Sequence, residues 1–177
     1  MKTAMARPKR VRKPSTKKSG PTARLNAHIN PEDLTTIVSL FTSGRSGTSL
    51  ISSLLDSHPW VATTPDDVLM GFYVFWEAFS YRESEALTEA FIDQFGTLFN
   101  GAEPSKNPKS GLCHGELVGF TTMGENRDQV LSADVDVFRS SLREMLPPGK
   151  TVIRRLFMQA LHVAYADAIG HRLEKGA

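Results

Sequence analysis

Apolar and polar positions change their spacing between residues 35 and 61, and this change predicts the central element of the chain. From Thr35 onward the chain is apolar and partly β-branched, with four large apolar residues: Ile37, Val38, Leu40 and Phe41. Such a run predicts a parallel strand that is covered on both faces. From residue 50 the apolar residues follow helical spacing instead: Leu50, Ile51, Leu54 and Leu55. We therefore expect a strand, a short loop and a helix that ends at His58, before Pro59.

Downstream of this unit, the apolar spacing predicts helices. They are expected at residues 68–79, 84–99, 128–145 and 150–172, the third broken near residues 132–134 and the last long and amphipathic. In the second helix, Ser84 is the expected N-cap, and one face is apolar: Leu87, Phe91, Phe95 and Leu98. The first, residues 68–79, is rich in large apolar residues, which fits a helix that lines a pocket or, more simply, a core helix. These patterns predict an α/β fold that is helix-rich after its first strand and helix.

The charge of the chain is unevenly distributed. Its 177 residues have a composition typical of one globular domain, with 40% hydrophobic and 23% charged residues. Residues 1–31 contain nine Lys or Arg and no acid, whereas the remainder has a net charge of −7. Because the first segment is also poor in large apolar residues, residues 1–30 are expected to be a disordered basic tail before a domain of residues 31–177.

The simplest interpretation of this tail is a solvated, solubilising segment. The alternatives are an arm that contacts nucleic acid or an anionic surface, a nuclear-import-like cluster, or a targeting extension. The chain has no run of about eighteen apolar residues, so no membrane span is expected.

The single cysteine, Cys113, excludes an intrachain disulfide and fits a reducing, cytoplasmic location. Cys113, His114 and Glu116 lie close together in the sequence. They lack a fourth ligand at a recognised spacing, so we expect no metal site.

The loop between the predicted strand and helix, Ser43 to Ser49, has the residues of an anion-binding site. The start of a helix offers four backbone N–H groups without intrahelical partners and the positive end of the helix dipole. Gly44 and Gly47 allow the backbone to approach a ligand closely. Arg45 adds a planar donor fork suited to phosphate or sulfate. The first helical turn adds two hydroxyl donors: Thr48 and Ser49. The expected ligand is a phosphate-like group.

This loop is not a Walker A motif, because Thr42 stands where the first Gly belongs and Thr48 where the Lys belongs. Instead, Ser43–Val61, SGRSGTSLISSLLDSHPWV, resembles the 5′-phosphosulfate-binding loop of sulfotransferases that use 3′-phosphoadenosine 5′-phosphosulfate. The Arg-Ser-Gly-Thr-Ser form and the later Asp-x-His-Pro are similar to the branch that includes tyrosylprotein and many bacterial sulfotransferases. The resemblance is specific over these residues and faint elsewhere.

The resemblance implies a P-loop NTPase-like three-layer sulfotransferase fold, with 3′-phosphoadenosine 5′-phosphosulfate as the co-substrate and no metal. It implies that six residues bind the 5′-phosphosulfate: Gly44, Arg45, Ser46, Gly47, Thr48 and Ser49. Arg45 would also stabilise charge on the bridging oxygen as the sulfuryl group moves to a hydroxyl or amine. The acceptor would be a small molecule, a carbohydrate or a peptide.

The resemblance also implies a general base. In the tyrosylprotein branch, a Glu at the spacing of Asp66 from Arg45 accepts the proton of the acceptor hydroxyl. Here the Glu-Glu pair of that branch is replaced by Pro65-Asp66, and an Asp side chain is one methylene shorter. Asp66, or Asp67 beside it, is alternatively the N-cap of the helix expected near Val68.

Three other polar residues each have a possible functional role and a simpler structural one. His58 is either a base or, more simply, a structural residue at the end of its helix. Arg154 and Arg155 either face the anion of the cofactor or acceptor or, more simply, are surface charge.

One part of the family pattern has no counterpart in the chain. Family members have a downstream Arg and Ser that hold the 3′-phosphate, commonly after a strand reading like Val-Arg-Asp-Pro, and nothing between Gly111 and Ala177 matches it. We therefore expect the chain to cover the amino-terminal portion of the family domain. The alternatives to an active sulfotransferase are an inactive or truncated relative, a P-loop phosphoryl-transfer protein, and a non-catalytic scaffold with a basic arm.

Overall fold

The computed structural model describes residues 24–38, 51, 54–55, 58–65, 71–102 and 126–174. Its helices, with η for a 3₁₀ helix, are η1 Pro31–Asp33, α2 Phe72–Phe79, α3 Ser84–Gln94, η3 Gly96–Leu98, α5 Val135–Met145 and α6 Arg154–Ala168. Within the described ranges the chain has no strand, and an isolated antiparallel bridge joins Asn100 and Ser132. This part of the protein is helix-rich, as predicted for the region after the first strand and helix.

The α-helices lie within the segments that helical spacing predicted, but three local predictions are wrong. Ser84 is not the N-cap of α3, because Glu83 holds that position and the Ser84 hydroxyl donates to the carbonyl of Pro147 at 2.8 Å. The last helix is not amphipathic, because residues on more than one side of α6 are buried. The helix expected over residues 128–145 begins only at Val135, with Asp134 as its N-cap, and residues 128–134 are not helical, so the expected break is instead the start of α5.

The first residues of the predicted central strand differ from the prediction. Residues 35–38 belong to neither helix nor sheet, and Ile37 and Val38 are 52% and 73% exposed. A strand requires a neighbour that pairs its N–H and C=O groups, and the described residues offer it none. Residues 39–50, which contain the rest of that strand and the loop, lie outside the described ranges.

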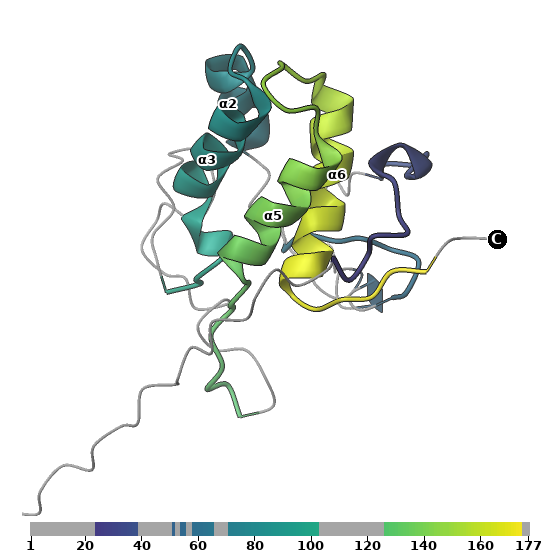
Figure 1. Ribbon diagram of the computed structural model, residues 1–177. Coiled ribbons are helices and arrows are strands. Elements are labelled where there is room, and N and C mark those ends of the chain that lie inside the picture. The colour runs from purple at the N-terminus through teal and green to yellow at the C-terminus, as the bar shows by residue number, and fades with distance from the viewer. Residues whose placement is uncertain are drawn as a thin grey trace, which may run out of the picture.

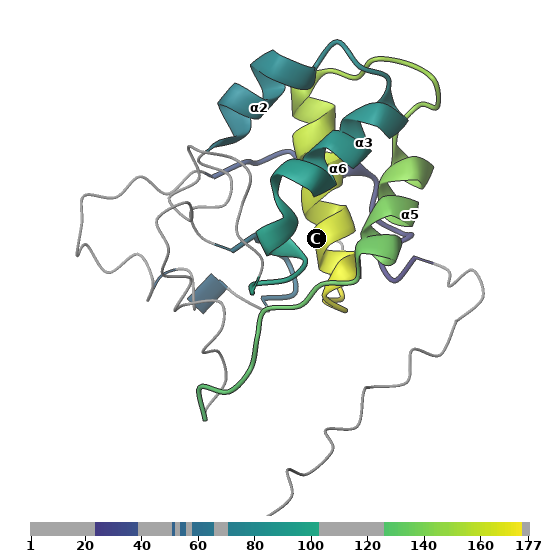
Figure 2. The ribbon, with the colours of Figure 1, turned by 90° about the vertical axis from the view of Figure 1, so that its left-hand side faces the viewer.

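The helices are arranged around α6. In Figure 1, α2 and α3 lie on one side of α6, α5 lies against it, and residues 24–38 lie on the side away from α2 and α3. The turned view in Figure 2 keeps the α2–α3 turn and the α5–α6 connection at the same end of the bundle. A hydrogen bond of 2.9 Å from the Ser84 amide to the Lys150 carbonyl joins these two connections. The helix α6 therefore has neighbours on opposite sides.

On the side of α2, α3 and α5, α6 is covered by aromatic rings, and we call this the aromatic side. Phe91 is fully buried, and its ring centroid lies 4.5 Å from that of Phe95 and 5.8 Å from that of Phe138. Phe157 of α6 is also fully buried and contacts the ring of Phe91 edge to face. Stacked and edge-to-face rings of this kind add to the hydrophobic stabilisation of a core. The predicted apolar face of residues 84–99 is confirmed as part of this core.

On the opposite side, α6 carries a smaller apolar cluster, and we call this the flank side. Its buried members are Ile29, Val163, Ala166 and Leu173. The chain reaches Leu173 because α6 ends in a reversal in which Gly170 has a left-handed φ of 73°. Residues 171–174 thus return along the protein beside the N-terminal segment.

Candidate functional site

The sequence-predicted site residues, Gly44 to Ser49 and Asp66, lie outside the residues that the structure describes. Their assignment therefore stays a prediction. The structure does describe the chain before the loop, residues 24–38, and the chain after it, residues 58–65, which we call the first and second flanks. How these flanks are held decides where the loop can start and end.

The first flank is attached to α6 through Asp167. The side chain of Asp167 is fully buried and accepts from the Asn26 amide at 2.8 Å and from the Ser141 hydroxyl at 2.7 Å. The Arg24 guanidinium, whose side chain is 9% exposed, forms an ion pair with it at 3.3 Å. A buried carboxylate requires such partners, since an unpaired one is strongly destabilising. Residues 24–30, which the sequence places in the basic tail, are here packed onto the domain.

Further hydrogen bonds continue this attachment toward the loop. The buried Asn26 side chain donates to the His171 carbonyl at 2.9 Å and accepts from the Leu173 amide at 2.7 Å. Closer to the loop, the Gln159 side chain donates to the Leu34 carbonyl at 2.6 Å. Gln159 is 4% exposed, so this bond forms in a largely apolar setting.

The second flank is attached to the same region of the protein. The Glu174 amide donates to the Pro59 carbonyl at 2.7 Å, and the Trp60 indole donates to the Glu174 carboxylate at 3.2 Å. Ala62 packs against the apolar cluster of the flank side. Both flanks therefore meet α6 and residues 171–174.

His58, at the start of the second flank, takes part in a chain reversal. Its amide donates to the Leu55 carbonyl at 3.1 Å, and its carbonyl accepts from the Val61 amide at 3.0 Å. Its ring Nδ1 accepts from the Trp60 amide at 3.3 Å. These bonds fit the structural role at a helix end rather than that of a free base.

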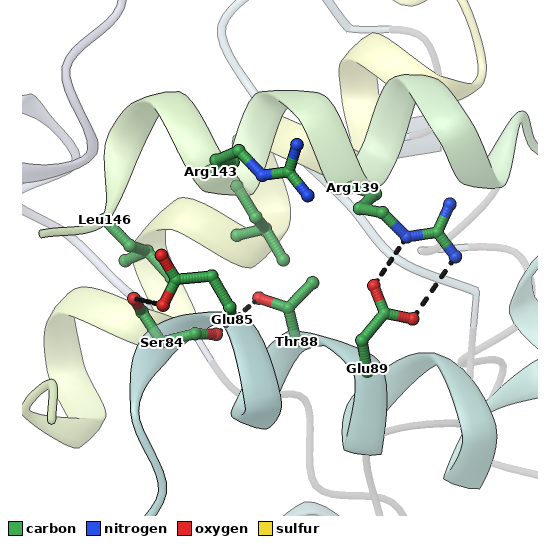
Figure 3. Close-up of a pocket in the computed structure, with 8 residues that line it drawn as sticks. Ser84, Glu85, Thr88, Glu89, Arg139, Arg143 and Leu146 are labelled. Atoms are coloured by element: carbon green, nitrogen blue, oxygen red, sulfur yellow. Dashed lines mark hydrogen bonds and ion pairs between the residues drawn. The ribbon is translucent and has the colours of Figure 1, made fainter. Parts of the chain in front are cut away.

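A pocket between α3 and α5 is a second candidate site, and Figure 3 shows its lining residues. Arg139 forms a two-point ion pair with Glu89, with N–O distances of 2.6 and 3.3 Å, and a further pair with Asp136. These hydrogen bonds raise the pKa of Arg139. Because the guanidinium is occupied by two carboxylates, this end of the pocket is a helix-to-helix contact rather than an anion site.

The other end of the pocket contains Glu85. Hydrogen bonds from its own backbone amide, from the Gly149 amide at 3.1 Å and from the Ser84 hydroxyl at 2.9 Å lower the pKa of this carboxyl. Glu85 therefore stays ionised and ties the start of α3 to the α5–α6 connection. Neither end offers an unpaired nucleophile or base.

Two other features of α6 bear on the predictions. Arg154 and Arg155 form its first turn and are exposed, in keeping with the simpler interpretation as surface charge. His162 is half-buried, and burial lowers the pKa of its imidazole. Its Nδ1 lies 2.8 Å from the Met158 carbonyl in the same helix.

The residues that hold the flanks, chiefly Asp167, Asn26, Gln159 and Glu174, were missed in the sequence. The sequence did contain one indication of these contacts, because Gln159 and Asp167 are polar residues within the most buried helix. A polar residue inside an apolar helix commonly has a partner, but helical spacing does not identify it.

Among the described residues, no group of three or more His, Cys, Asp and Glu side chains lies close enough to hold a metal ion. In the same ranges, none of the helices has the length and hydropathy of a membrane span. Comparisons of the chain with protein-family models, with curated proteins and with solved structures found no match.

Proposed function

We propose that this protein binds 3′-phosphoadenosine 5′-phosphosulfate through residues 44–49 and transfers its sulfuryl group to a hydroxyl or amine. The sequence from Ser43 to Val61 carries the proposal. It places two glycines, an arginine and two hydroxyl residues between an apolar run and an apolar helical stripe. The helical conformation of three described residues after the loop, Ile51, Leu54 and Leu55, supports the helical half of this unit.

In the proposed reaction, the acceptor oxygen or nitrogen attacks the sulfur atom, and the bond from sulfur to the bridging oxygen breaks. Adenosine 3′,5′-bisphosphate leaves, and its new negative charge develops on that bridging oxygen. Backbone amides of Gly47 to Ser49 and the guanidinium of Arg45 are suited to stabilise this charge. Asp66 accepts the proton that the acceptor loses.

The proposal includes a P-loop NTPase-like three-layer fold, in which the predicted strand before Ser43 belongs to a parallel sheet; the structure has the first residues of that prediction, 35–38, in neither helix nor sheet. The exposed Ile37 and Val38 are apolar side chains of the kind that such a sheet covers. The described helices would then be the helical layer that follows the first strand and helix.

Calorimetric titration with adenosine 3′,5′-bisphosphate tests the binding step. We expect binding by the wild type that Arg45→Ala weakens about ten- to hundredfold, since charge-assisted hydrogen bonds are worth about 1.5–3 kcal/mol. Arg45→Lys is the matched control, because it keeps the charge and loses the two-point donor fork, and an intermediate affinity is expected. Unchanged affinity in Arg45→Ala would remove Arg45 from the site.

Transfer of labelled sulfate from the donor to phenolic, sugar and peptide acceptors tests the chemistry. Asp66→Asn is expected to reduce transfer about 10²–10⁴-fold, the usual contribution of a general base. The adjacent Asp67→Asn is its matched control and is expected to retain most activity. The reverse result would move the base to Asp67, and equal small losses would leave both as helix caps.

The same titrations separate the alternatives. Magnesium-dependent ATP or GTP binding without bisphosphate binding would favour a phosphoryl-transfer protein. A protein that binds no nucleotide, but binds DNA or RNA in a salt-sensitive manner that deletion of residues 1–23 abolishes, would be a scaffold with a basic arm.

A further inference from the structure

The α2–α3 turn and the α5–α6 connection form one end of the helical bundle. Figures 1 and 2 both show them at the same end, and we call residues 80–85 and 147–155 the connection end. The Ser84 amide donates to the Lys150 carbonyl at 2.9 Å, and the Ser84 hydroxyl donates to the Pro147 carbonyl at 2.8 Å. Because these bonds hold the two segments together, their exposed side chains belong to one surface.

The connection end is positively charged. It has four basic residues: Arg82, Lys150, Arg154 and Arg155. Within the described part of the chain, none of the four forms an ion pair. The surface has two acids, of which Glu83 is exposed and Glu85 already accepts from the Gly149 amide and the Ser84 hydroxyl. Since residues 32–177 have a net charge of −7, this end differs in sign from the domain as a whole.

The stability of α6 does not explain the residues at its start. Arg154 and Arg155 form the first turn, which contains no acid, although the helix dipole disfavours cations there. The N-cap is Ile153, which makes no side-chain cap hydrogen bond, whereas a Ser, Thr, Asp or Asn would make one. Three consecutive residues thus oppose the local preferences of a helix, and such exceptions are typical of functional surfaces.

Two large apolar side chains are exposed among these charges. Ile153 is 70% exposed, and Tyr81 is 71% exposed. The Arg82 guanidinium lies 4.7 Å from the centroid of the Phe79 ring and 6.0 Å from that of Tyr81. The connection end therefore presents an aliphatic and an aromatic side chain beside cations, a combination that fits an amphipathic, anionic partner.

A membrane with anionic lipids satisfies all of these features together. Its surface potential attracts Lys and Arg, Tyr is favoured at the boundary between lipid and water, and an aliphatic side chain gains free energy on entering the acyl region. A nucleic acid would engage the same cations and stack on Tyr81, but Ile153 has no ring on which a base can stack. The exposed Ile153 therefore favours the membrane.

We propose that the connection end docks on an anionic phospholipid membrane. Tyr81 and Ile153 enter the interface, and the four basic side chains contact the lipid headgroups. This contact is peripheral and needs no membrane-spanning helix. It is independent of the proposed sulfuryl transfer, so the failure of either proposal leaves the other standing.

Sedimentation of the full chain with phospholipid vesicles tests the charged part of the surface. We expect binding to phosphatidylcholine vesicles with about one third phosphatidylserine, weaker binding to phosphatidylcholine alone, and a decrease with added salt. The double variant Arg154→Gln/Arg155→Gln is expected to bind the anionic vesicles about 25-fold more weakly, about fivefold for each charge. Residues 1–23 are kept in every protein, so their own attraction to anionic lipid is common to all.

Two further double variants serve as controls. Arg127→Gln/Arg172→Gln removes the same charge at exposed positions before α5 and after α6, outside the connection end, and is expected to stay within about twofold of the wild type. Arg154→Lys/Arg155→Lys keeps the charge and is expected to retain binding, because a lipid surface attracts the charge and does not require the planar fork of Arg.

Substitution of Ile153 tests the apolar part. Ile153→Ser is expected to weaken vesicle binding about tenfold, since its methylene and methyl groups no longer leave water. Ile169→Ser is the matched control, because Ile169 is the C-cap at the other end of the same helix and is also exposed, at 38%. Urea titration verifies that both variants fold.

Quenching of tryptophan fluorescence by brominated lipids shows whether this residue enters the membrane. The chain has two tryptophans, so Trp60→Phe/Trp76→Phe provides a background without indole. In that background, Ile153→Trp is expected to be quenched and shifted to shorter wavelength by anionic vesicles, and Ile169→Trp is expected to remain unquenched.

The outcomes decide between the membrane and other partners. Loss of vesicle binding in Arg154→Gln/Arg155→Gln but not in its charge-matched control, with quenching of Ile153→Trp, supports the proposal. Equal vesicle binding by the two Gln double variants, or vesicle-bound Ile153→Trp without quenching, overturns it. The proposal is also overturned if the Gln substitutions at Arg154 and Arg155 weaken binding of a single-stranded RNA and leave vesicle binding unchanged, since the surface would then be a nucleic-acid site.

Discussion

The two sides of α6 are held by different kinds of contact. On the aromatic side, the fully buried rings of Phe91, Phe138 and Phe157 pack together. On the flank side, four small or aliphatic residues form the apolar cluster, and the chain is held by hydrogen bonds and by the Arg24–Asp167 ion pair. One side buries large apolar area, and the other fixes particular backbone groups.

The aromatic side therefore mainly determines the stability of the fold, whereas the flank side mainly determines the position of the two flanks. Apolar burial is non-directional and roughly proportional to area, so the aromatic side supplies most of the folding free energy. Hydrogen bonds of buried groups contribute about 0.5–1.5 kcal/mol each but are directional, so the flank side determines where the flanks lie. Predictions for the two sides should therefore differ in size and in what they change.

The largest effect is expected at the centre of the aromatic side. Phe91→Ala removes a fully buried ring and leaves a cavity, so we expect a loss of about 3–5 kcal/mol in the free energy of unfolding, measured by urea titration. Tyr81→Ala is the control, because Tyr81 is 71% exposed and its loss should change stability by about 0.5 kcal/mol or less. A loss below about 1 kcal/mol in Phe91→Ala would mean that the aromatic side is not the stabilising core.

The next effect is expected at Asp167 on the flank side. Asp167→Asn leaves the guanidinium of Arg24 without its counter-charge and removes an acceptor of the Ser141 hydroxyl. We expect a loss of about 2 kcal/mol, below the 3–5 kcal/mol typical of a broken buried pair, because Asn keeps an acceptor oxygen for the Asn26 amide. Trypsin cleavage after Arg24 should also accelerate. Equal cleavage rates in the wild type and in Asp167→Asn would contradict the attachment of the first flank to α6. Ser141→Ala is the control for the loss of a single hydrogen bond to Asp167.

A smaller effect is expected at the junction of α5 and α6. The Asp134 carboxylate accepts from the amides of Asp136 and Val137 at 2.9 and 3.0 Å, and the Asp134 amide donates to the Ala168 carbonyl at 3.0 Å. Asp134→Ala should cost about 1 kcal/mol by thermal unfolding, the usual value of an N-cap. Asp134→Asn keeps the cap and should be close to wild type. Equal losses in both variants would assign the effect to charge instead.

The smallest effect is a pH dependence from His162, which helical spacing places near Gln159 on the flank side. Burial lowers the pKa of its imidazole below the ordinary 6.5, so below about pH 6.5 the unfolded chain binds a proton that the folded chain does not. The free energy of unfolding should thus be constant above this range and fall as the pH falls through it. The pKa of Glu85 is also lowered, but its effect on the free energy of unfolding falls below the ordinary carboxyl value of 4.5, outside the pH range in which His162 titrates.

Urea titrations of wild type and His162→Gln from about pH 7 to about pH 5 measure this dependence, and the variant should show a shallower fall. The exposed, non-titrating Val130→Ala is the control and should keep the wild-type slope. Identical slopes in all three proteins would show that burial of His162 does not affect stability.

The helices were predictable to a useful degree because their signals are local. Leu87, Phe91, Phe95 and Leu98 repeat with helical spacing, and all four are fully buried in the structure. The N-cap of α3 was misassigned by one position, because Ser84 has a distant partner, the Pro147 carbonyl, that competes with capping. Local rules identify such elements well and their ends less well.

The candidate loop was found from its residue types, since glycines, arginine and hydroxyls between a strand-like and a helix-like run have a chemical meaning on their own. The attachment of its flanks was not predictable in the same way. Asn26 and Asp167 are far apart in the sequence, and neither is unusual in its local context.

The sequence by itself predicted most of the helical segments, and it predicted a short loop whose residue types suit a sulfate or phosphate group. Both follow from interactions between residues that are near each other along the chain. Only the tertiary structure decided that α6 is buried on two sides, and that residues 24–34 and 59–62 meet on one of them. The physical reason is that buried polar groups must find partners, and folding brings those partners from remote parts of the chain.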